Sequence, residues 1–173
     1  LYRREEKVEE IYKKYSQKIY KYLYGLTNDV ELAQELMQET FYSAIKGINT
    51  FNGNSKISVW LYEIAKNKWK NYLRENSKRK SVFLNDSKGI EKVVCEGELS
   101  EQLSTKSEVL DLYKAIHKLE EEVKEVFYLR IKGDLSFKEI AEITGKSEEW
   151  ARVNFYRGKL KLKEELLKNE KGV

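Results

Sequence analysis

The sequence predicts an all-α protein with two small helical domains joined by a flexible linker. Its 173 residues include no proline and only nine glycines, so few residues interrupt a helix. Apolar residues recur at steps of three and four residues toward both ends of the chain, which is the period of an amphipathic helix. Between these two parts of the chain, apolar residues no longer recur at a regular spacing. These observations divide the chain into residues 1–80, a linker over 81–107, and residues 108–173.

Composition excludes several classes of protein. Hydrophobic residues make up 40% of the chain and charged residues 36%, which is too apolar for a disordered chain. No run of about 18 apolar residues and no charged-then-apolar leader is present, so we expect neither a membrane span nor a signal peptide. A single cysteine, Cys95, excludes an internal disulfide and is typical of a reducing compartment. We therefore expect a cytoplasmic protein.

Three helices are expected in the N-terminal part. The first covers about residues 8–26, the second 30–48, and the third runs from 57 toward 73. Asp29 is the expected N-cap of the second helix, because its carboxylate can accept hydrogen bonds from first-turn amides. The segment 49–55 is dense in turn-forming residues. The apolar stripe of the second helix consists of Ala33, Leu36, Met37, Thr40, Phe41, Ala44, Ile45 and Ile48.

Helices resume near Glu108, and the last two are expected to form a helix-turn-helix. Ser136 and Glu139 have the spacing of a capping box, in which serine accepts a hydrogen bond from a first-turn amide while glutamate reaches back. The short helix after Ser136 ends near Gly145, and Ser147 caps the next helix. Two helices joined by a short glycine-containing turn are typical of a DNA-binding motif.

The last helix divides into two faces. At 100° per residue, Ala151, Phe155, Gly158 and Leu162 share one stripe. The opposite side presents Arg152, Val153, Tyr156 and Arg157, with Trp150 nearer the N-terminal end and Lys159 extending the positive charge. Arginine can hold the O6 and N7 edge of guanine with two hydrogen bonds, and an apolar side chain can touch a thymine methyl. We therefore interpret the last helix as one that contacts base edges in the major groove, rather than as a basic helix that is only exposed to solvent.

Charge is distributed unevenly along the chain, whose net charge is +4. Residues 56–80 contain eight Lys/Arg and two Glu, a net +6, and residues 150–163 contain five Lys/Arg and no acids, a net +5. Residues 81–111 contain three Lys and seven acids, a net −4. Basic patches on separate units are typical of a nucleic-acid binder, although a Lys-rich helix can also be a solvated face.

Two stretches resemble the sigma-70 family of RNA polymerase sigma factors. The run Ala33-Gln-Glu-Leu-Met-Gln-Glu-Thr-Phe41 resembles the signature of its second conserved region, and Phe51-Asn-Gly-Asn-Ser55 and Trp60-Leu-Tyr-Glu-Ile-Ala-Lys-Asn67 follow as in that family. The end of the chain, including Leu135-Ser-Phe-Lys-Glu-Ile-Ala-Glu-Ile143, resembles the fourth region. With only these two regions and a short linker, the chain is similar to the extracytoplasmic-function (ECF) class.

This resemblance implies a transcription initiation factor that binds core RNA polymerase and promoter DNA and is controlled by an anti-sigma factor, which can be membrane-bound. The docking face for polymerase would consist of Glu35, Gln38, Glu39 and Tyr42. The downstream (−10) element would be contacted, as it melts, by Asn52, Asn54, Ser55, Lys56, Lys66, Asn67, Lys70 and Arg74. The upstream (−35) element would be read as duplex by Trp150, Arg152, Val153, Tyr156, Arg157 and Lys159.

Two tryptophans are candidate stacking platforms for an unstacked base. Trp60 continues the apolar stripe of its helix, so we expect it in the core, whereas Trp69 lies off that stripe. In the last helix, Glu149 and Trp150 stand where many family members have glycine and threonine, and Val153 stands where serine is frequent. These departures leave the upstream sequence preference open.

The sequence contains no pattern for a catalytic, metal or cofactor site. It has one histidine, His117, one cysteine, and no glycine-rich phosphate loop, H-E-x-x-H or C-x-x-C. The main alternative is an autonomous helix-turn-helix regulator, which would bind duplex DNA by itself. This alternative does not explain why the segment 56–80 is basic. An adaptor that only clamps proteins leaves Arg152 and Arg157 unexplained. The acidic linker is expected to lie in a positively charged channel of the polymerase.

Overall fold

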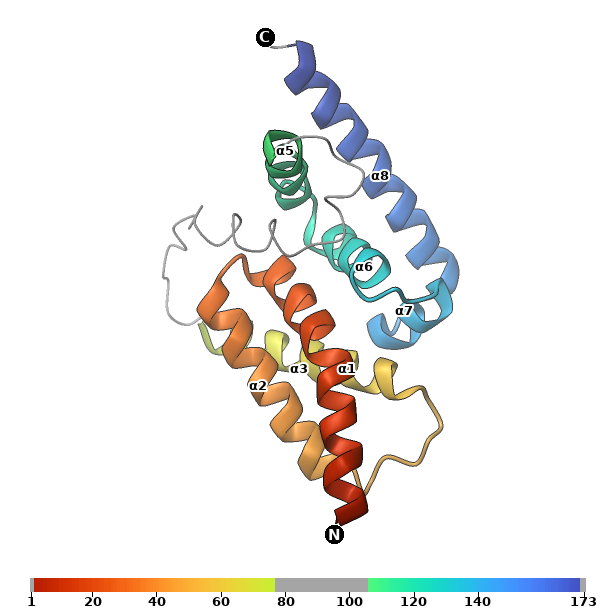
Figure 1. Ribbon diagram of the computed structural model, residues 1–173. Helices are drawn as coiled ribbons and strands as arrows, with labels where there is room; N and C mark the ends of the chain where they lie inside the picture. The colour runs from red at the N-terminus through yellow and green to blue at the C-terminus, as the bar shows by residue number, and fades with distance from the viewer. Residues whose placement is uncertain (1, 77–105, 172–173) are drawn as a thin grey trace.

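All regular elements in the described part of the chain, residues 2–76 and 106–171 of the computed structural model, are α-helices (Figure 1). The structure does not describe residues 77–105. This range contains Cys95, the basic residues 78–80 and all but the last two residues of the predicted linker over 81–107. The helices are α1 (Tyr2–Thr27), α2 (Val30–Gly47), α3 (Ile57–Asn76), α5 (Lys106–His117), α6 (Glu121–Ile131), α7 (Phe137–Thr144) and α8 (Glu148–Lys171). No helix in these ranges has both the length and the apolarity to cross a bilayer.

Helices α1, α2 and α3 pack against one another and form what we call the N-terminal unit. The Asp29 carboxylate accepts a hydrogen bond of 3.0 Å from the Leu32 amide, which confirms the predicted cap of α2. The predicted apolar stripe of α2 is buried at most of its positions. Ile45 is an exception, because its side chain is 47% exposed at the solvent edge of the helix.

Helices α5 to α8 form the C-terminal unit, in which α8 packs against α5, α6 and α7. The capping box before α7 is present: Glu139 N–H donates to Ser136 Oγ at 3.2 Å, and Ser136 N–H donates to Glu139 Oε2 at 2.7 Å. Gly145 ends α7 with φ of +68°, a left-handed conformation that suits glycine. Trp150 N–H then donates to Ser147 Oγ at 3.0 Å, as predicted for the start of α8.

Replacing Ser136 with alanine is expected to lower the free energy of unfolding by about 0.5–2 kcal/mol, because the Glu139 amide loses its acceptor at the start of α7. Urea unfolding followed by circular dichroism measures this change. Ser136→Thr, which keeps the hydroxyl, is the control and is expected to stay close to the unchanged protein. Equal stability of the alanine and threonine variants would show that the cap contributes nothing.

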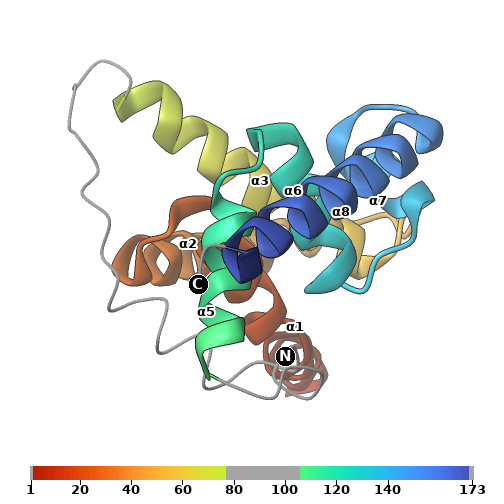
Figure 2. The same cartoon turned by 90° about the horizontal axis from the view of Figure 1, so that it is seen from above.

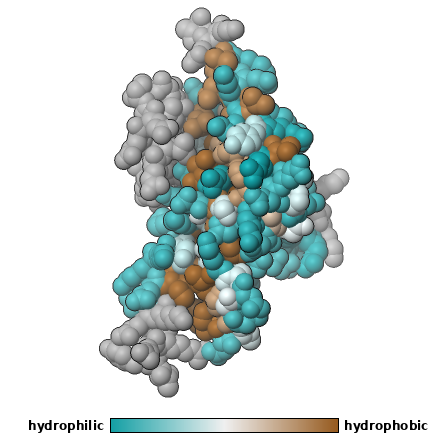
Figure 3. Space-filling view, turned by 90° about the vertical axis from the view of Figure 1, so that its right-hand side faces the viewer, coloured by the Kyte–Doolittle hydropathy of each residue, from teal (hydrophilic) through white to brown (hydrophobic). Residues whose placement is uncertain are grey.

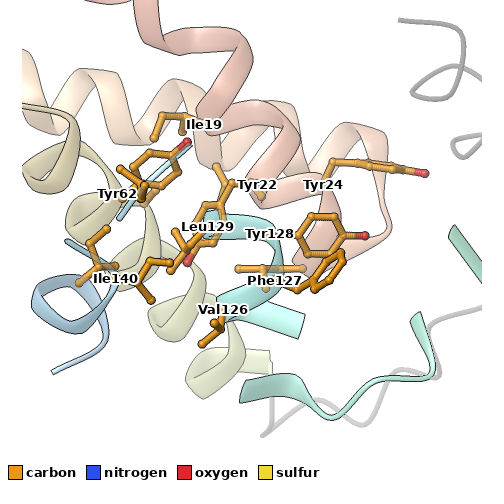
Figure 4. Packing of buried hydrophobic residues seen from close by; sticks show 14 of the residues in the cluster. Ile19, Tyr22, Tyr24, Tyr62, Val126, Phe127, Tyr128, Leu129 and Ile140 are labelled. Carbon is orange, nitrogen blue, oxygen red and sulfur yellow. The ribbon is translucent and has the colours of Figure 1, made fainter. Parts of the chain in front are cut away.

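The two units pack directly against each other, an arrangement that the sequence left open. Helix α6 lies beside α1, and α7 lies beside α3, while α8 covers the outer side of α6 and α7 (Figures 1 and 2). One continuous cluster of buried apolar side chains runs through both units. Figure 4 shows Tyr22 and Tyr62 of the N-terminal unit close to Leu129 and Ile140 of the C-terminal unit. The rings of Tyr22 and Tyr62 meet edge to face at 5.3 Å.

Candidate nucleic-acid interface

The exposed face of α8 carries the predicted reading residues. Arg152, Val153, Tyr156, Arg157 and Lys159 are all exposed, and Val153 and Tyr156 keep 48% and 54% of their surface accessible. The other face is buried against the C-terminal unit through Ala151, Gly158 and Leu162. An added Cβ at Gly158 would meet Val123 at 3.0 Å, so the small residue allows the close packing. The predicted division of this helix into two faces is confirmed.

Arg152 is held by two contacts before any ligand binds. Its guanidinium lies 2.9 Å from a carboxylate oxygen of Glu148, one turn earlier, and 5.4 Å from the ring centroid of Phe137. Both Arg152 and Glu148 are about half exposed, and an exposed pair of this kind contributes little free energy, about 0.2–1 kcal/mol. A base edge can therefore displace Glu148 at small cost, while Phe137 keeps the guanidinium on the reading side.

Three aromatic rings support the reading face from beneath, and the sequence did not single out this group. Phe137 of α7 lies 5.6 Å from Phe155 and 6.5 Å from Tyr156 of α8, measured between ring centroids. Phe155 also stacks on Phe127 of α6 at 5.5 Å. The rings connect the two helices of the helix-turn-helix. The signal was present in the sequence, because Phe155 belongs to the apolar stripe.

Trp150 packs against the core of the C-terminal unit and is half-buried rather than fully available to DNA. Its ring also lies 5.7 Å from the Lys146 ammonium. One turn later, Asn154 is buried and its amide donates to the Trp150 carbonyl at 2.9 Å. Sequence analysis did not identify Asn154 as buried, although it lies three residues after Ala151 and four before Gly158, at the edge of the buried stripe.

The loop between α2 and α3 carries four of the eight predicted downstream-element residues. Asn52, Asn54 and Lys56 are exposed, and Ser55 is half-buried. The loop is shaped by a hydrogen bond of 3.1 Å from the Asn54 amide to Asn52 Oδ1 and by Gly53, whose φ is +75°. Amide side chains at such an exposed turn can hydrogen-bond the edge of an unstacked base.

Trp60 packs against the core at the start of α3, as its place in the apolar stripe predicts. Its ring lies 5.0 Å from Phe51, and an added Cβ at Gly47 would meet it at 3.3 Å. Trp69 also packs against the core and stacks on Tyr72 at 5.7 Å. Both tryptophans are half-buried, so neither is a free-standing platform for a base in this structure.

The predicted downstream-element residues of α3 fall into two groups. Asn67, Lys70 and Arg74 are exposed. Lys66 is only 6% exposed, and its Nζ lies 3.1 Å from Glu125 Oε1 of the C-terminal unit. The structure therefore separates Lys66 from the residues with which the sequence grouped it.

Lys56, at the end of the loop, also contacts the C-terminal unit. Its Nζ lies 2.9 Å from Glu139 Oε1. Burial alone would raise the pKa of Glu139, but the hydrogen bonds from Lys56 and Ser136 outweigh it and hold the pKa below its ordinary value. The same contact raises the pKa of Lys56. Both groups are thus charged at neutral pH and attract each other.

The predicted polymerase-docking residues lie on one exposed face of α2. Glu35, Gln38, Glu39 and Tyr42 are exposed, and Tyr42 keeps 61% of its surface accessible. This face lies opposite the buried stripe of α2. Two cations border it: Lys46 Nζ is 4.2 Å from the Tyr42 ring centroid, and Lys68 Nζ is 3.4 Å from a Glu39 carboxylate oxygen. The face is mixed in charge and available to a protein partner.

Other kinds of site have no support in the described residues. They contain no group of three or more side chains placed to bind a metal ion. His117 is half-buried, and burial lowers its pKa below the ordinary value. On the side of the molecule that carries α7 and α8, hydrophilic side chains surround scattered apolar ones (Figure 3).

Comparison with known proteins identifies both units. Residues 11–79 match the family model described as Sigma-70 region 2, and residues 110–162 match Sigma-70, region 4. The chain is 31% identical to the RNA polymerase sigma factor YlaC of Bacillus subtilis, over 95% of this chain and 94% of that protein. It is 30% identical to the ECF RNA polymerase sigma factor SigW of the same organism, over 88% of this chain and 84% of that protein.

A solved structure extends the similarity to the fold. The sigma factor RpoE of Bartonella quintana, determined in complex with the anti-sigma factor NepR, superposes with a TM-score of 0.73. The two chains are 20% identical, and the match covers 92% of this chain and 96% of the other. Together with the helix-turn-helix and the basic exposed face of α8, these matches show that the chain belongs to the extracytoplasmic-function sigma factors of the sigma-70 family.

Proposed function

We propose that this chain directs core RNA polymerase to promoters by reading the upstream element as duplex and the downstream element as it melts. Its family membership makes it an initiation factor rather than an enzyme. The observation that carries the finer assignment is the exposed face of α8, where Arg152, Val153, Tyr156 and Arg157 stand on the second helix of a helix-turn-helix. Lys159 and the lysines beyond it are suited to phosphate contacts.

The downstream element is assigned to the loop 49–56 and to the exposed side of α3. Asn52, Asn54 and Ser55 can hydrogen-bond an extruded base, and a base leaves the stack at a cost of a few kcal/mol. Lys70 and Arg74 follow one another along α3 at a step of four residues, which suits a path along one strand. The division into residues 1–80 and 108–173 stays a prediction that separates these two tasks.

Two protein partners are part of this proposal. Core polymerase is expected on the face of α2 formed by Glu35, Gln38, Glu39 and Tyr42. An anti-sigma factor is expected to control the chain, because the similar sigma factor RpoE was solved in complex with one. We place the protein in the cytoplasm, where an inhibitor either free or anchored in the membrane can reach it.

Run-off transcription from a pool of genomic fragments, with purified core polymerase and with or without this chain, tests the proposal. Discrete start sites that depend on the chain are expected, and aligning them gives the two promoter elements. An absence of new starts, together with tight binding of the chain alone to a two-fold symmetric duplex, would instead support an autonomous regulator.

Reversing the charge of Glu39 is expected to weaken polymerase binding without changing upstream-element specificity. Glu39→Lys places a cation beside Lys68, with which Glu39 is now paired at 3.4 Å. We expect at least about a tenfold loss of affinity, because like charges at a docking surface are costly. Fluorescence anisotropy with core polymerase measures it.

Glu9→Lys is the matched control for this prediction. Glu9 is also an exposed carboxylate paired with a lysine, Lys13, but it lies on α1 and outside the predicted docking face. It is expected to leave polymerase affinity unchanged. Equal losses for both variants would indicate a general charge effect and would contradict the docking assignment.

A further inference from the structure

Phe137 lies where α7 meets α8, and its phenyl ring has no N–H or O–H group with which to read a base edge. We propose that Phe137 is a positioning residue, whose ring sets where the Arg152 guanidinium lies and thereby the base preference at the base pair that Arg152 contacts. The inference rests on the proposed function, because the reading of the upstream element by Arg152 belongs to that proposal. It adds a residue that determines specificity through another side chain.

Arg152 has a long side chain that needs support if it is to read a base. The side chain is 55% exposed. A free arginine side chain populates many rotamers, and fixing it on DNA opposes the contact through lost entropy. Contacts that restrict the side chain before binding remove part of that cost. For Arg152, such contacts come from Glu148 and Phe137.

These two contacts restrain Arg152 in different ways. A Glu148 carboxylate oxygen on the same helix accepts a hydrogen bond of 2.9 Å from Arg152 Nη2. A base edge and a carboxylate both accept from the guanidinium N–H groups, so each excludes the other. The Phe137 ring belongs to α7, and Arg152 Cζ lies over it at 5.4 Å from the centroid. A ring does not use up these N–H groups, so this contact can persist while Arg152 holds a base.

The ring of Phe137 is itself held in place. It is half-buried and packs against the core. Its centroid lies 5.6 Å from the Phe155 ring centroid and 5.1 Å from Cζ of Arg130. Arg130 in turn donates a hydrogen bond of 2.6 Å to the Leu135 carbonyl, in the turn before α7. The ring is therefore a fixed support for Arg152.

The capping box fixes the backbone at the point where this ring begins. Phe137 is the first residue of α7, directly after the cap Ser136. Helix α7 packs against α8, and Figure 1 shows it beside the N-terminal part of that helix. The start of α7 is thus set against the first turns of α8. The pair Phe137 and Arg152 couples the two helices of the helix-turn-helix.

The position of the Arg152 guanidinium can be measured in the full chain without DNA. A proton that lies over the face of an aromatic ring resonates upfield. We therefore expect an upfield Nε–H signal from Arg152 in a proton–nitrogen correlation spectrum, and Arg152→Lys identifies that signal by removing it. Phe137→Leu should return the signal to the ordinary arginine range. Phe137→Tyr, which keeps the ring, should leave the signal upfield.

The effect on specificity is measured with the holoenzyme. A promoter mapped by run-off transcription is randomised over its upstream element, and the duplexes that the holoenzyme binds are sequenced. The base pair that Arg152 contacts is the one whose preference Arg152→Ala removes. At that base pair, Phe137→Leu should lower the preference by roughly two- to fivefold, as expected for an exposed cation–π contact. Phe137→Tyr should keep the preference.

Phe127→Leu is the matched control for a purely structural effect. Phe127 is 8% exposed and stacks on Phe155 at 5.5 Å, so it belongs to the same group of rings. The chemical change is identical and the position is more buried, so the loss of stability should be at least as large. The ring over which Arg152 lies is that of Phe137. Phe127→Leu should therefore leave both the Arg152 signal and the base preference unchanged.

A double variant distinguishes positioning from direct contact, because a phenyl ring can also touch a thymine methyl. In an Arg152→Ala background, Phe137→Leu should change the base preference no further, since a residue that acts through Arg152 then has nothing to act on. A further change in that background would show that Phe137 contacts DNA itself, and it would overturn the inference.

Loss of the upfield signal together with loss of preference at one base pair in Phe137→Leu, and retention of both in Phe137→Tyr, supports the positioning role. An Arg152 signal in the ordinary range in the unchanged chain, or a preference that Phe137→Leu leaves intact, would overturn it while the proposed function stands. A holoenzyme without any upstream preference would overturn the proposed function, and this inference with it. If circular dichroism shows that Phe137→Leu does not fold, Phe137→Met, which also removes the ring, takes its place.

Discussion

Replacing both Arg152 and Arg157 with alanine is expected to abolish most of the discrimination between a natural upstream element and a scrambled one. Both side chains are exposed and lie away from the buried face of α8. A bidentate contact from arginine to guanine contributes about 1–3 kcal/mol, so each substitution should lower the specificity ratio by roughly 5- to 150-fold. Binding competition on duplexes from mapped promoters measures the ratio with the holoenzyme.

Lys163→Ala is the informative comparison for the two arginines. Lys163 is exposed further along α8 and is expected to contact phosphate only. It should weaken natural and scrambled duplexes alike and reduce the salt slope by about 0.9. If the arginine variants behaved in the same way, α8 would be an electrostatic anchor, and the reading of sequence would have to lie elsewhere.

Leu61→Ala is expected to cause the largest loss of stability among the variants considered. Leu61 lies in the centre of the N-terminal unit and is fully buried, at 0% exposure. Removing a buried leucine side chain leaves a cavity, and such changes cost about 2–5 kcal/mol. Since whole domains are stable by about 5–15 kcal/mol, a large part of the stability would be lost. Urea unfolding followed by circular dichroism provides the measurement.

Leu73→Ala is the matched control on the same helix. The chemical change is identical, and both positions have the same intrinsic helix propensity difference. Leu73 is 42% exposed, so its removal should cost less than about 1 kcal/mol. Similar losses at the two positions would mean that α3 is not anchored through Leu61 in solution.

The sequence by itself determined the local features of this protein. The helical period predicted the helices, although α1 begins at Tyr2, six residues before the predicted start. Side chains close in sequence predicted the caps at Asp29, Ser136 and Ser147. The exposed face of α8 was predictable for the same reason, because the angular position of a residue on a helix follows from its number alone. The resemblance to sigma-factor motifs is what led us to predict polymerase docking for the exposed face of α2 and DNA contact for that of α8.

Only the tertiary structure decided which of the predicted contact residues are accessible. Lys66 and Lys70 are one turn apart on α3, yet Lys66 is buried against Glu125 and Lys70 is exposed. Helical period cannot distinguish them, because the partner of Lys66 is 59 positions away in the chain. The burial of a side chain depends on which surfaces pack together, and that is the sum of many weak contacts between distant segments. The packing of the two units, and with it the burial of Lys66, follows from that sum.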